Sequence, residues 1–259
     1  MVLMIEAQSL TKRFPSGSGV SDLTFSVARG ELFVFLGPNG AGKSTTVKML
    51  TGLLDPDVGT ARVDGFDSVR DRLSVKLAIG YMAERPYLYD KLTAREYVTF
   101  VADVFSVPAD LRRKRMTELF AAFEIADAAD HLIETYSHGM RQKTALAAVL
   151  IHEPSVLFLD EPTNGLDPRS SRIVKDVLRA ICDRGATVFM TTHVLEVAEQ
   201  MCDRVAILDH GHLVTIGTMS DLRRETGIED GTLEDVYLAL TGAAETPTLS
   251  LYATAGPRA

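Results

Sequence analysis

Residues 37–44 read GPNGAGKS, and they follow an apolar segment at residues 31–36 and precede a segment typical of a helix. The pattern G-x-x-x-x-G-K-[ST] in that position restricts the fold more than any other feature of the chain. Its glycines let the backbone curl so that successive N–H groups point inward, and the helix N-terminus adds partial positive charge. Lys43 adds a full charge, and the Ser44 hydroxyl can ligate Mg²⁺. The stretch therefore predicts a phosphate-binding loop between a strand and a helix.

Composition limits the kinds of partner that the chain can have. Its 259 residues are enough for one or two domains, and the net charge is −8, with a pI of about 5.3. This balance argues against a broad basic face, so no nucleic-acid partner is expected. The two cysteines, Cys182 and Cys202, lack metal-ligand spacing and are expected to be small core residues in a reducing compartment.

Apolar runs in the sequence are short. Those at residues 155–160 and 186–192 have the length of strands and fall well short of the roughly 20 residues of a membrane span. The N-terminal stretch MVLMIEAQ has neither the basic region nor the apolar length of a signal peptide. We expect a soluble, cytoplasmic protein that reaches a membrane only through a partner.

Strand-like and helix-like segments alternate along the chain, apart from a helical stretch between residues 93 and 150. The expected strands are residues 4–10, 23–27, 31–37, 61–66, 77–84, 155–161 and 186–193, with a hairpin around residues 209–212. The expected helices are residues 42–53, 93–105, 115–126, 169–183 and 194–201, followed by two short helices, the second at residues 233–242. Buried strands that alternate with helices predict an α/β fold with a parallel-rich sheet and an inserted helical subdomain.

Two apolar strands are followed by residues suited to catalysis. Asp160 and Glu161 end one of them, at the carboxyl edge where ligands bind in such sheets. We expect Asp160 to hold the Mg²⁺ shell and Glu161 to polarise the attacking water. His193, expected as the last residue of another strand in the same sheet, can reach a γ-phosphate. A solvated strand end and a packing histidine are the alternatives for these residues.

The stretch TYSHGMRQKT at residues 135–144 contains no catalytic pair. Ser137 is a good N-cap for a helix whose apolar body follows at residues 145–151. The same helix start could bind a phosphate, because its N–H groups and dipole favour an anion.

Together these motifs resemble the nucleotide-binding subunit of an ATP-binding cassette (ABC) transporter, in the family's order and over roughly residues 3–242. GPNGAGKST resembles the Walker A loop, VLFLDE at residues 156–161 resembles Walker B, and His193 is similar to the switch histidine. Glu84 stands at the Q-loop position, where glutamine is usual, and would be catalytic and a Mg²⁺ ligand. The D-loop residues would be Gly165, Leu166 and Asp167. The nucleotide-binding residues would be Phe14, Gly37, Pro38, Asn39, Gly40, Ala41, Gly42, Lys43, Ser44 and Thr45.

In this resemblance the segment at residues 136–140 corresponds to the family signature, which binds the ATP of the opposite subunit. Its contacts would be Ser137, His138, Gly139 and Met140. His138 and Met140 replace the usual glycine and glutamine, and Phe14 replaces the usual tyrosine that stacks on adenine.

The resemblance implies a mechanism and partners. ATP and Mg²⁺ would be bound between two cassettes, the second being another copy of this chain or a related one. A separate multi-pass membrane permease would hold the subunit peripherally on the cytoplasmic face of the membrane. The branch most similar to this chain serves exporters of drugs, antibiotics, lipids or polysaccharides. The fold implied is a P-loop NTPase (ABC ATPase) core with a parallel-rich sheet, an antiparallel β-subdomain and an inserted helical subdomain. The cassette would span residues 1–242, with a helical subdomain at about 86–150, C-terminal helices at about 219–242 and a flexible tail at 243–259.

Several alternatives stay open at this point. A soluble ABC ATPase acting on a ribosome, a nucleic acid or a protein assembly would share these motifs, as would a nucleotide-binding module without turnover. Tyr87, Leu88 and Tyr89 could form an aromatic contact for a permease or could pack within the helical subdomain. The basic residues at 111–115 are expected to be a solvated face or loop, with a phospholipid contact as the alternative.

Overall fold

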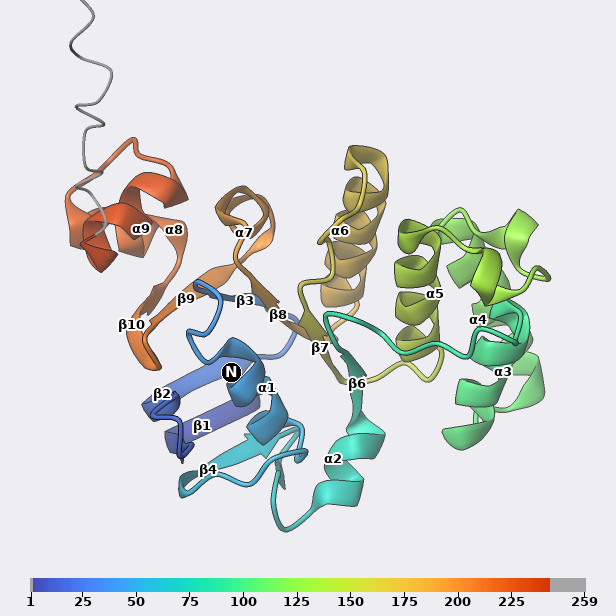
Figure 1. Ribbon diagram of the computed structural model, residues 1–259, viewed down its shortest axis with the longest axis horizontal. Helices are drawn as coiled ribbons and strands as arrows, with labels where there is room; N and C mark the ends of the chain where they lie inside the picture. Colours follow the sequence, from blue (N-terminus) through green and yellow to red (C-terminus); the bar gives the residue numbers. More distant parts are fainter. Residues whose placement is uncertain (1, 243–259) are drawn as a thin grey trace, which may run out of the picture.

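A six-stranded sheet forms the centre of the protein in a computed structural model that describes residues 2–242 (Figure 1). Its strand order is β10-β9-β3-β8-β7-β6, and every neighbouring pair is parallel except β10 with β9. The strands are β3 (Leu32–Leu36), β6 (Ile79–Met82), β7 (Val156–Asp160), β8 (Thr187–Thr192), β9 (Arg204–Asp209) and β10 (His212–Gly217). The expected parallel-rich sheet and the terminal hairpin are confirmed.

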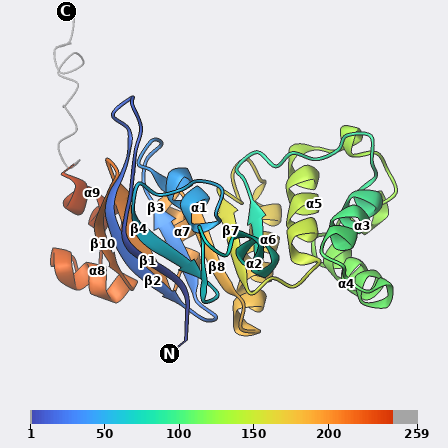
Figure 2. The ribbon, with the colours of Figure 1, turned by 90° about the horizontal axis from the view of Figure 1, so that it is seen from below.

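A second sheet is antiparallel and has the order β2-β1-β4-β5. Its strands are β1 (Leu3–Arg13), β2 (Gly19–Ala28), β4 (Val58–Val63) and β5 (Phe66–Asp67). It lies alongside the central sheet on the side of helix α1 (Figures 1 and 2). The α/β fold class, with an antiparallel β-subdomain and an inserted helical part, is therefore confirmed.

Strand β3 shows how the central sheet is covered on both faces. Leu32, Val34 and Leu36 belong to a core shared with the helices on one side, whereas Phe33 and Phe35 belong to a core shared with the antiparallel sheet. This split follows from the alternation of side chains along a strand. The covering helices are α1 (Lys43–Leu50) toward the antiparallel sheet, and α6 (Pro168–Asp183) and α7 (Leu195–Met201) on the opposite face.

Five phenylalanine rings join the two sheets. Phe189 of β8 lies with its ring centroid 5.3–6.0 Å from the other four, in tilted arrangements that aromatic pairs favour. One of these partners comes from β2 in the antiparallel sheet, and the others come from β3 and β7. The partners are Phe25, Phe33, Phe35 and Phe158. The antiparallel sheet is thus packed directly on the strands that carry the phosphate loop and the acidic residues.

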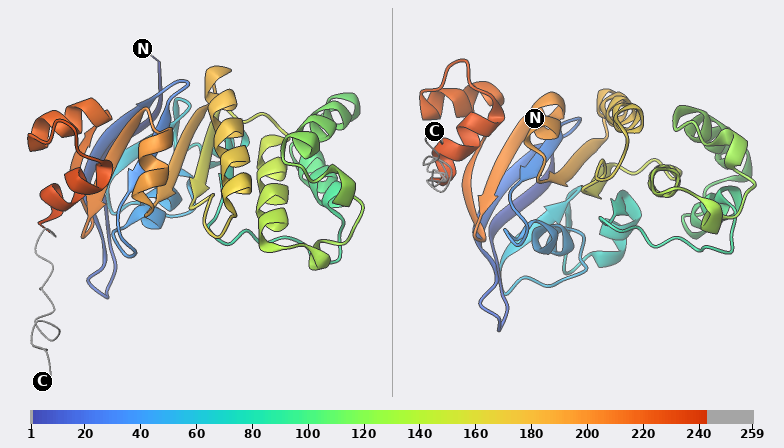
Figure 3. Two further views of the ribbon diagram at one scale, coloured as in Figure 1. Left: turned by 90° about the horizontal axis from the view of Figure 1, so that it is seen from above. Right: turned by 45° about the horizontal axis from the view of Figure 1, so that its top comes forward.

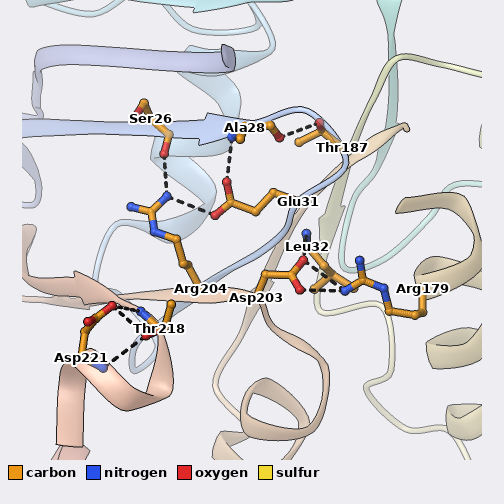
Figure 4. Close-up of polar contacts among 10 residues, drawn as sticks. All are labelled: Ser26, Ala28, Glu31, Leu32, Arg179, Thr187, Asp203, Arg204, Thr218 and Asp221. Carbon is orange, nitrogen blue, oxygen red and sulfur yellow. Dashed lines mark hydrogen bonds and ion pairs between the residues drawn. The ribbon is translucent and has the colours of Figure 1, made fainter. Parts of the chain in front are cut away.

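Charged side chains fix the amino ends of the central strands (Figure 4). Glu31, just before β3, accepts a hydrogen bond of 3.1 Å from Arg204 at the start of β9. Asp203 accepts the backbone N–H of Leu32 at 2.8 Å and pairs with Arg179 of α6 at 2.9 Å. These contacts set the relative positions of β3, β9 and α6 at the end of the sheet opposite the phosphate loop.

Helices occupy both ends of the molecule (Figures 2 and 3). One end carries the segment between β6 and β7, and the other carries two helices that each begin with a capping box. The first group comprises α3 (Ala94–Val104), α4 (Ala109–Ala122), two short 3₁₀ helices η1 (Ala126–Ala128) and η2 (Ile133–Thr135), and α5 (His138–Leu150). The second group comprises α8 (Met219–Thr226) and α9 (Leu233–Thr241).

The expected strands at residues 61–66 and 77–84 are confirmed in part, because β4 covers residues 61–63 and β6 covers Ile79–Met82. They do not pair with each other: β4 lies in the antiparallel sheet, and β6 pairs with β7 in the central sheet. Helix α2 (Arg72–Ala78), which was not expected, includes the first two residues of the second segment. A run such as LAIGYM reads as a single strand because a short apolar run has no period that separates a helix end from a strand start. Tertiary contacts decide that boundary.

The basic residues at 111–115 lie on α4, so the expected solvated helical face is confirmed. Arg112 pairs with Asp103, and Arg115 pairs with Glu153. Two of the four positive charges are therefore already neutralised within the helical group.

Both cysteines pack as expected. Cys182 is buried, Cys202 is partly buried, and burial raises the pKa of each thiol to about 11. In the described part of the chain no helix has the length and apolarity to span a membrane. The predicted tail at residues 243–259 lies outside the described residues.

Phe189→Ala should lower the free energy of unfolding by about 3–5 kcal/mol, because the cavity would open where four rings meet. Denaturant titration followed by circular dichroism measures this loss. Phe66→Ala, at a ring that is 39% exposed, is the matched control and should cost less than about 1 kcal/mol. Equal losses in the two variants would contradict a shared aromatic core.

Candidate active site

Glycines give the loop between β3 and α1 its shape. Gly40 and Gly42 have φ angles of +84° and +105°, which side chains disfavour. A Cβ on Gly42 would lie 2.3 Å from Val20 Cγ1, and a Cβ on Gly37 would lie 2.3 Å from the Leu208 carbonyl oxygen. The loop is therefore held against β2 and β9 at a distance that only glycine permits.

Lys43, the first residue of α1, is buried and directed back across the loop. Its Nζ donates hydrogen bonds to the Gly37 and Pro38 carbonyls at 2.6 and 3.2 Å and lies 3.8 Å from a Glu161 carboxylate oxygen. Burial lowers the pKa of Lys43, and the nearby carboxylates, Glu161 first, act in the opposite direction. The loop thus contains one concentrated positive charge beside its backbone N–H groups.

Asp160 joins the loop to the neighbouring strands through hydroxyl groups. The Ser44 hydroxyl donates to Asp160 Oδ2 at 2.8 Å, and the Thr191 hydroxyl of β8 donates to Asp160 Oδ1. Asp160 is only 5% exposed, so both carboxylate oxygens need such partners.

This oxygen set fits Mg²⁺. Among the described residues no group of three or more His, Cys, Asp or Glu side chains could hold a metal by itself. Mg²⁺ does not need one, because it is usually held by one or two protein oxygens together with waters and substrate phosphates. Asp160 Oδ2 and Ser44 Oγ supply two hard oxygen ligands at one point.

Glu161 follows β7 with its backbone in the left-handed region, at φ +50°. Its N–H donates to the Thr191 carbonyl at 3.1 Å, and its Oε1 lies 2.8 Å from His193 Nδ1. His193 is not part of the strand as expected, because β8 ends at Thr192 and the ring belongs to the following turn. The strand therefore ends one residue earlier than expected, and the imidazole of His193 is nevertheless in contact with Glu161.

A cavity of about 220 Å³ lies over the loop and is lined by many of the expected residues. Of its acidic lining residues, Glu84 is exposed, whereas Asp160 and Glu161 are buried. Those of the expected residues that line it are Pro38, Asn39, Gly40, Gly42, Lys43, Ser44, Thr45, Glu84, Asp160 and Glu161. A polar cavity with one lysine and three carboxylates is suited to a phosphate ester bound together with a cation.

Phe14 lies outside this cavity and lines a neighbouring one of about 470 Å³. The two share Ser18, Gly19 and Gly40, so they form one continuous surface. The ring of Phe14 is half-buried at the turn between β1 and β2. A base stacked on it would lie beside the phosphates held by the loop.

The segment at residues 137–140 is not brought to either cavity. Ser137 is the N-cap of α5 and accepts the Met140 N–H at 3.3 Å, as the sequence predicts. Ser137 and His138 are exposed at the helix start. Asp167 caps α6 in the same way by accepting the Ser170 N–H at 3.0 Å.

Ser18 and Gly19 line the cavity and escaped the sequence analysis. Two residues that contact the site from outside the cavity lining, Thr191 and Gln142, escaped it as well. Thr191 donates a hydrogen bond to Asp160. The sequence feature that could have pointed to it is a polar residue within an expected strand, which the structure shows to be fully buried. Gln142 is 1% exposed and donates to the Pro162 carbonyl at 3.1 Å. The sequence feature that could have pointed to Gln142 is an amide on the buried face of an apolar helix, and it is a weaker indication than the one for Thr191.

A glycine loop with a lysine, an oxygen pair for Mg²⁺, and a carboxylate bonded to a histidine defines a phosphate-loop nucleotide hydrolase. The family model described as "ABC transporter" matches residues 20–164. The chain is 41% identical to the daunorubicin/doxorubicin resistance ATP-binding protein DrrA of Streptomyces peucetius, over 86% of this chain and 68% of that protein. The chain therefore belongs to the ABC transporter family, as an ATP-binding subunit with ATPase activity.

Two further proteins support this placement. The chain is 38% identical to the fluoroquinolones export ATP-binding protein Rv2688c of Mycobacterium tuberculosis, over 94% of this chain and 83% of that protein. A solved ATP-binding subunit of an ABC transporter superposes with a TM-score of 0.87 at 30% identity, over 92% of this chain and 99% of that one.

Thr191→Val should raise the Mg²⁺ concentration needed for half-maximal ATPase activity by about tenfold, because Asp160 would lose a donor that orients its carboxylate. Titrating Mg²⁺ at saturating ATP measures the shift. Thr187→Val at the other end of β8, where the hydroxyl donates to the Ala28 carbonyl at 2.9 Å, is the control and should leave the midpoint unchanged. An unchanged midpoint in Thr191→Val would exclude this orienting role.

Proposed function

We propose that this chain is the ATP-hydrolysing subunit that powers a separate membrane permease, in the export of a drug- or antibiotic-like compound. The observation that carries the proposal is the convergence of Lys43, Asp160 and Glu161 on one cavity beside the loop. The relatives named for daunorubicin resistance and for fluoroquinolone export support the direction and the class of cargo.

The chemistry follows from the contacts of this chain's own residues. The loop N–H groups and Lys43 hold the β- and γ-phosphates, and Phe14 stacks on the adenine. Glu161 orients and polarises the attacking water, and His193 keeps the carboxylate in place and reaches the γ-phosphate. Mg²⁺, when bound at Ser44 and Asp160 with Glu84 nearby, supplies charge neutralisation at the phosphates.

The signature segment supplies the other half of the site. Ser137 and Gly139 stand at the exposed start of α5, away from the chain's own cavity. Such a helix start suits a phosphate presented by another subunit, because its N–H groups and dipole favour an anion. Two cassettes would therefore enclose two nucleotides, with the D-loop at Gly165–Asp167 between the sites. In this arrangement residues 1–242 form the cassette, with a helical subdomain at 86–150 and terminal helices at 219–242.

The three residues of the aromatic segment after the Q-loop differ in burial. Leu88 is 3% exposed and packs in the core, whereas Tyr87 is 85% exposed and Tyr89 is 48% exposed. The Tyr89 ring makes an edge contact of 5.8 Å with Phe100 of α3, which is itself exposed. We assign this surface, close to Glu84, to the permease, which would hold the subunit on the cytoplasmic face of the membrane.

Glu161→Gln should bind ATP without hydrolysing it, because an amide keeps the shape of the side chain but cannot polarise water as a carboxylate does. We expect the variant to dimerise in Mg-ATP and to remain dimeric, and to be monomeric in Mg-ADP. Light scattering after size-exclusion chromatography measures the mass. A monomer at every ATP concentration would contradict the enclosed-nucleotide mechanism.

Tyr87→Ser with Tyr89→Ser should reduce recovery of the permease by about tenfold, since two exposed aromatic anchors would be lost. The measurement is affinity purification from detergent-solubilised membranes of the source organism, with mass spectrometry of the bound chains. Val214→Ser on β10, at an exposed residue of the opposite end of the molecule, is the control and should not change recovery. Recovery of ribosomes or a soluble assembly with the unaltered chain would place the ATPase outside transport.

A further inference from the structure

The N-terminal part of α5 is hydrogen-bonded to the loop that follows Glu161 in the same chain. His138 Nε2 lies 3.2 Å from the Asn164 carbonyl oxygen. A carbonyl only accepts, so this nitrogen carries the proton and donates. Gln142 Nε2 donates to the Pro162 carbonyl at 3.1 Å. The two side chains are four residues apart and so lie on one face of the helix.

Packing reinforces these hydrogen bonds. A Cβ added to Gly165 would lie 3.2 Å from the His138 ring, and one added to Gly139 would lie 3.5 Å from Leu166 Cδ2. Gly165 has a φ of +71°, which also disfavours a side chain there. The loop and the helix start are therefore in direct contact along residues 162–166.

Gln142 occupies its position at an energetic cost. It is 1% exposed, and its Oε1 has no hydrogen-bond partner within residues 2–242. A buried acceptor without a partner destabilises a protein, and an apolar side chain of the same length would avoid that cost. The amide is thus better explained by its contact with Pro162 than by the stability of the helix.

Glu161 needs such support from its loop. Its φ of +50° is a conformation that non-glycine residues rarely adopt, and it persists only where surrounding contacts hold it. On the strand side it is held by the Thr191 carbonyl and by His193. On the loop side the Asn164 N–H donates to the Glu161 carbonyl at 3.1 Å, so a hydrogen bond links the position of Asn164 to that of Glu161.

We propose that His138 and Gln142 are positioning residues that hold the Pro162–Leu166 loop, so that Glu161 is correctly placed on the nucleotide bound by the same chain. The proposal rests on the proposed function and adds a second task to α5. Ser137 and Gly139 face the nucleotide of the partner subunit, whereas the two positioning residues act within their own chain.

The two tasks predict different kinetics. Loss of a phosphate contact weakens nucleotide-driven dimerisation and raises KM, whereas loss of positioning lowers kcat alone. We expect His138→Leu and Gln142→Met each to lower kcat by about tenfold, because small misplacements of a reacting group are costly. KM for ATP should stay within about twofold of the unaltered chain. His138→Gln, which can still donate to the Asn164 carbonyl, should recover most of the rate.

Two controls accompany the kinetics. His131→Leu replaces an exposed histidine of the same helical group whose side chain has no hydrogen bond to the loop among residues 2–242, and it should leave kcat unchanged. Thermal unfolding of Gln142→Met tests whether a lower rate reflects a lower folded fraction. His138 is exposed, so its variants are expected to fold. They therefore test the positioning role even if Gln142→Met is unstable.

Dimerisation separates this proposal from the proposed function. In the Glu161→Gln background, adding His138→Leu should leave the ATP-driven dimer intact. Loss of that dimer, or a raised KM with normal kcat, would overturn the positioning role and assign His138 to the partner's phosphates. Failure of Glu161→Gln alone to dimerise would instead refute the proposed function.

Discussion

Burial of the central strands on both faces is the constraint on which the site depends. With helices on one side and the antiparallel sheet on the other, β3, β7 and β8 are buried throughout. Charged groups are therefore confined to the strand ends. At the amino ends they form the network of Glu31, Asp203 and their arginines, which fixes the strands relative to one another. At the carboxyl ends they remain available for a ligand.

Patterns among neighbouring residues were sufficient to predict much of this architecture. The loop at residues 37–44 combines a glycine-rich turn, a lysine and a strand–helix context, and each of these is set by neighbours in sequence. The same holds for the Ser137 cap and for Asp160 at the end of an apolar run. A short apolar run gives no such signal, and for that reason the last two residues of α2 were assigned to the same strand as β6.

The features that could not be predicted from the sequence depend on contacts between segments far apart in the chain. Thr191 and Asp160 are 31 residues apart and meet only because β7 and β8 pair in a particular register. Gln142 and Pro162 meet only because α5 packs beside the end of β7. Exposure is also a property of the whole fold, and so Leu88 became buried while Tyr87 did not. One sequence carries no information on registers and packing angles of this kind.

The nucleotide surface spans both sheets. Phe14 and Gly19 come from the β1–β2 hairpin, whereas Lys43 and Asp160 belong to the central sheet and its first helix. ATP bound there would act as a cross-brace between two layers that are otherwise joined by the phenylalanine core. By thermodynamic linkage, a ligand at 100 times its Kd adds about 2.7 kcal/mol to the folded state. A chain with a weakened core could therefore remain folded at cellular ATP levels and lose its structure when the nucleotide is exhausted.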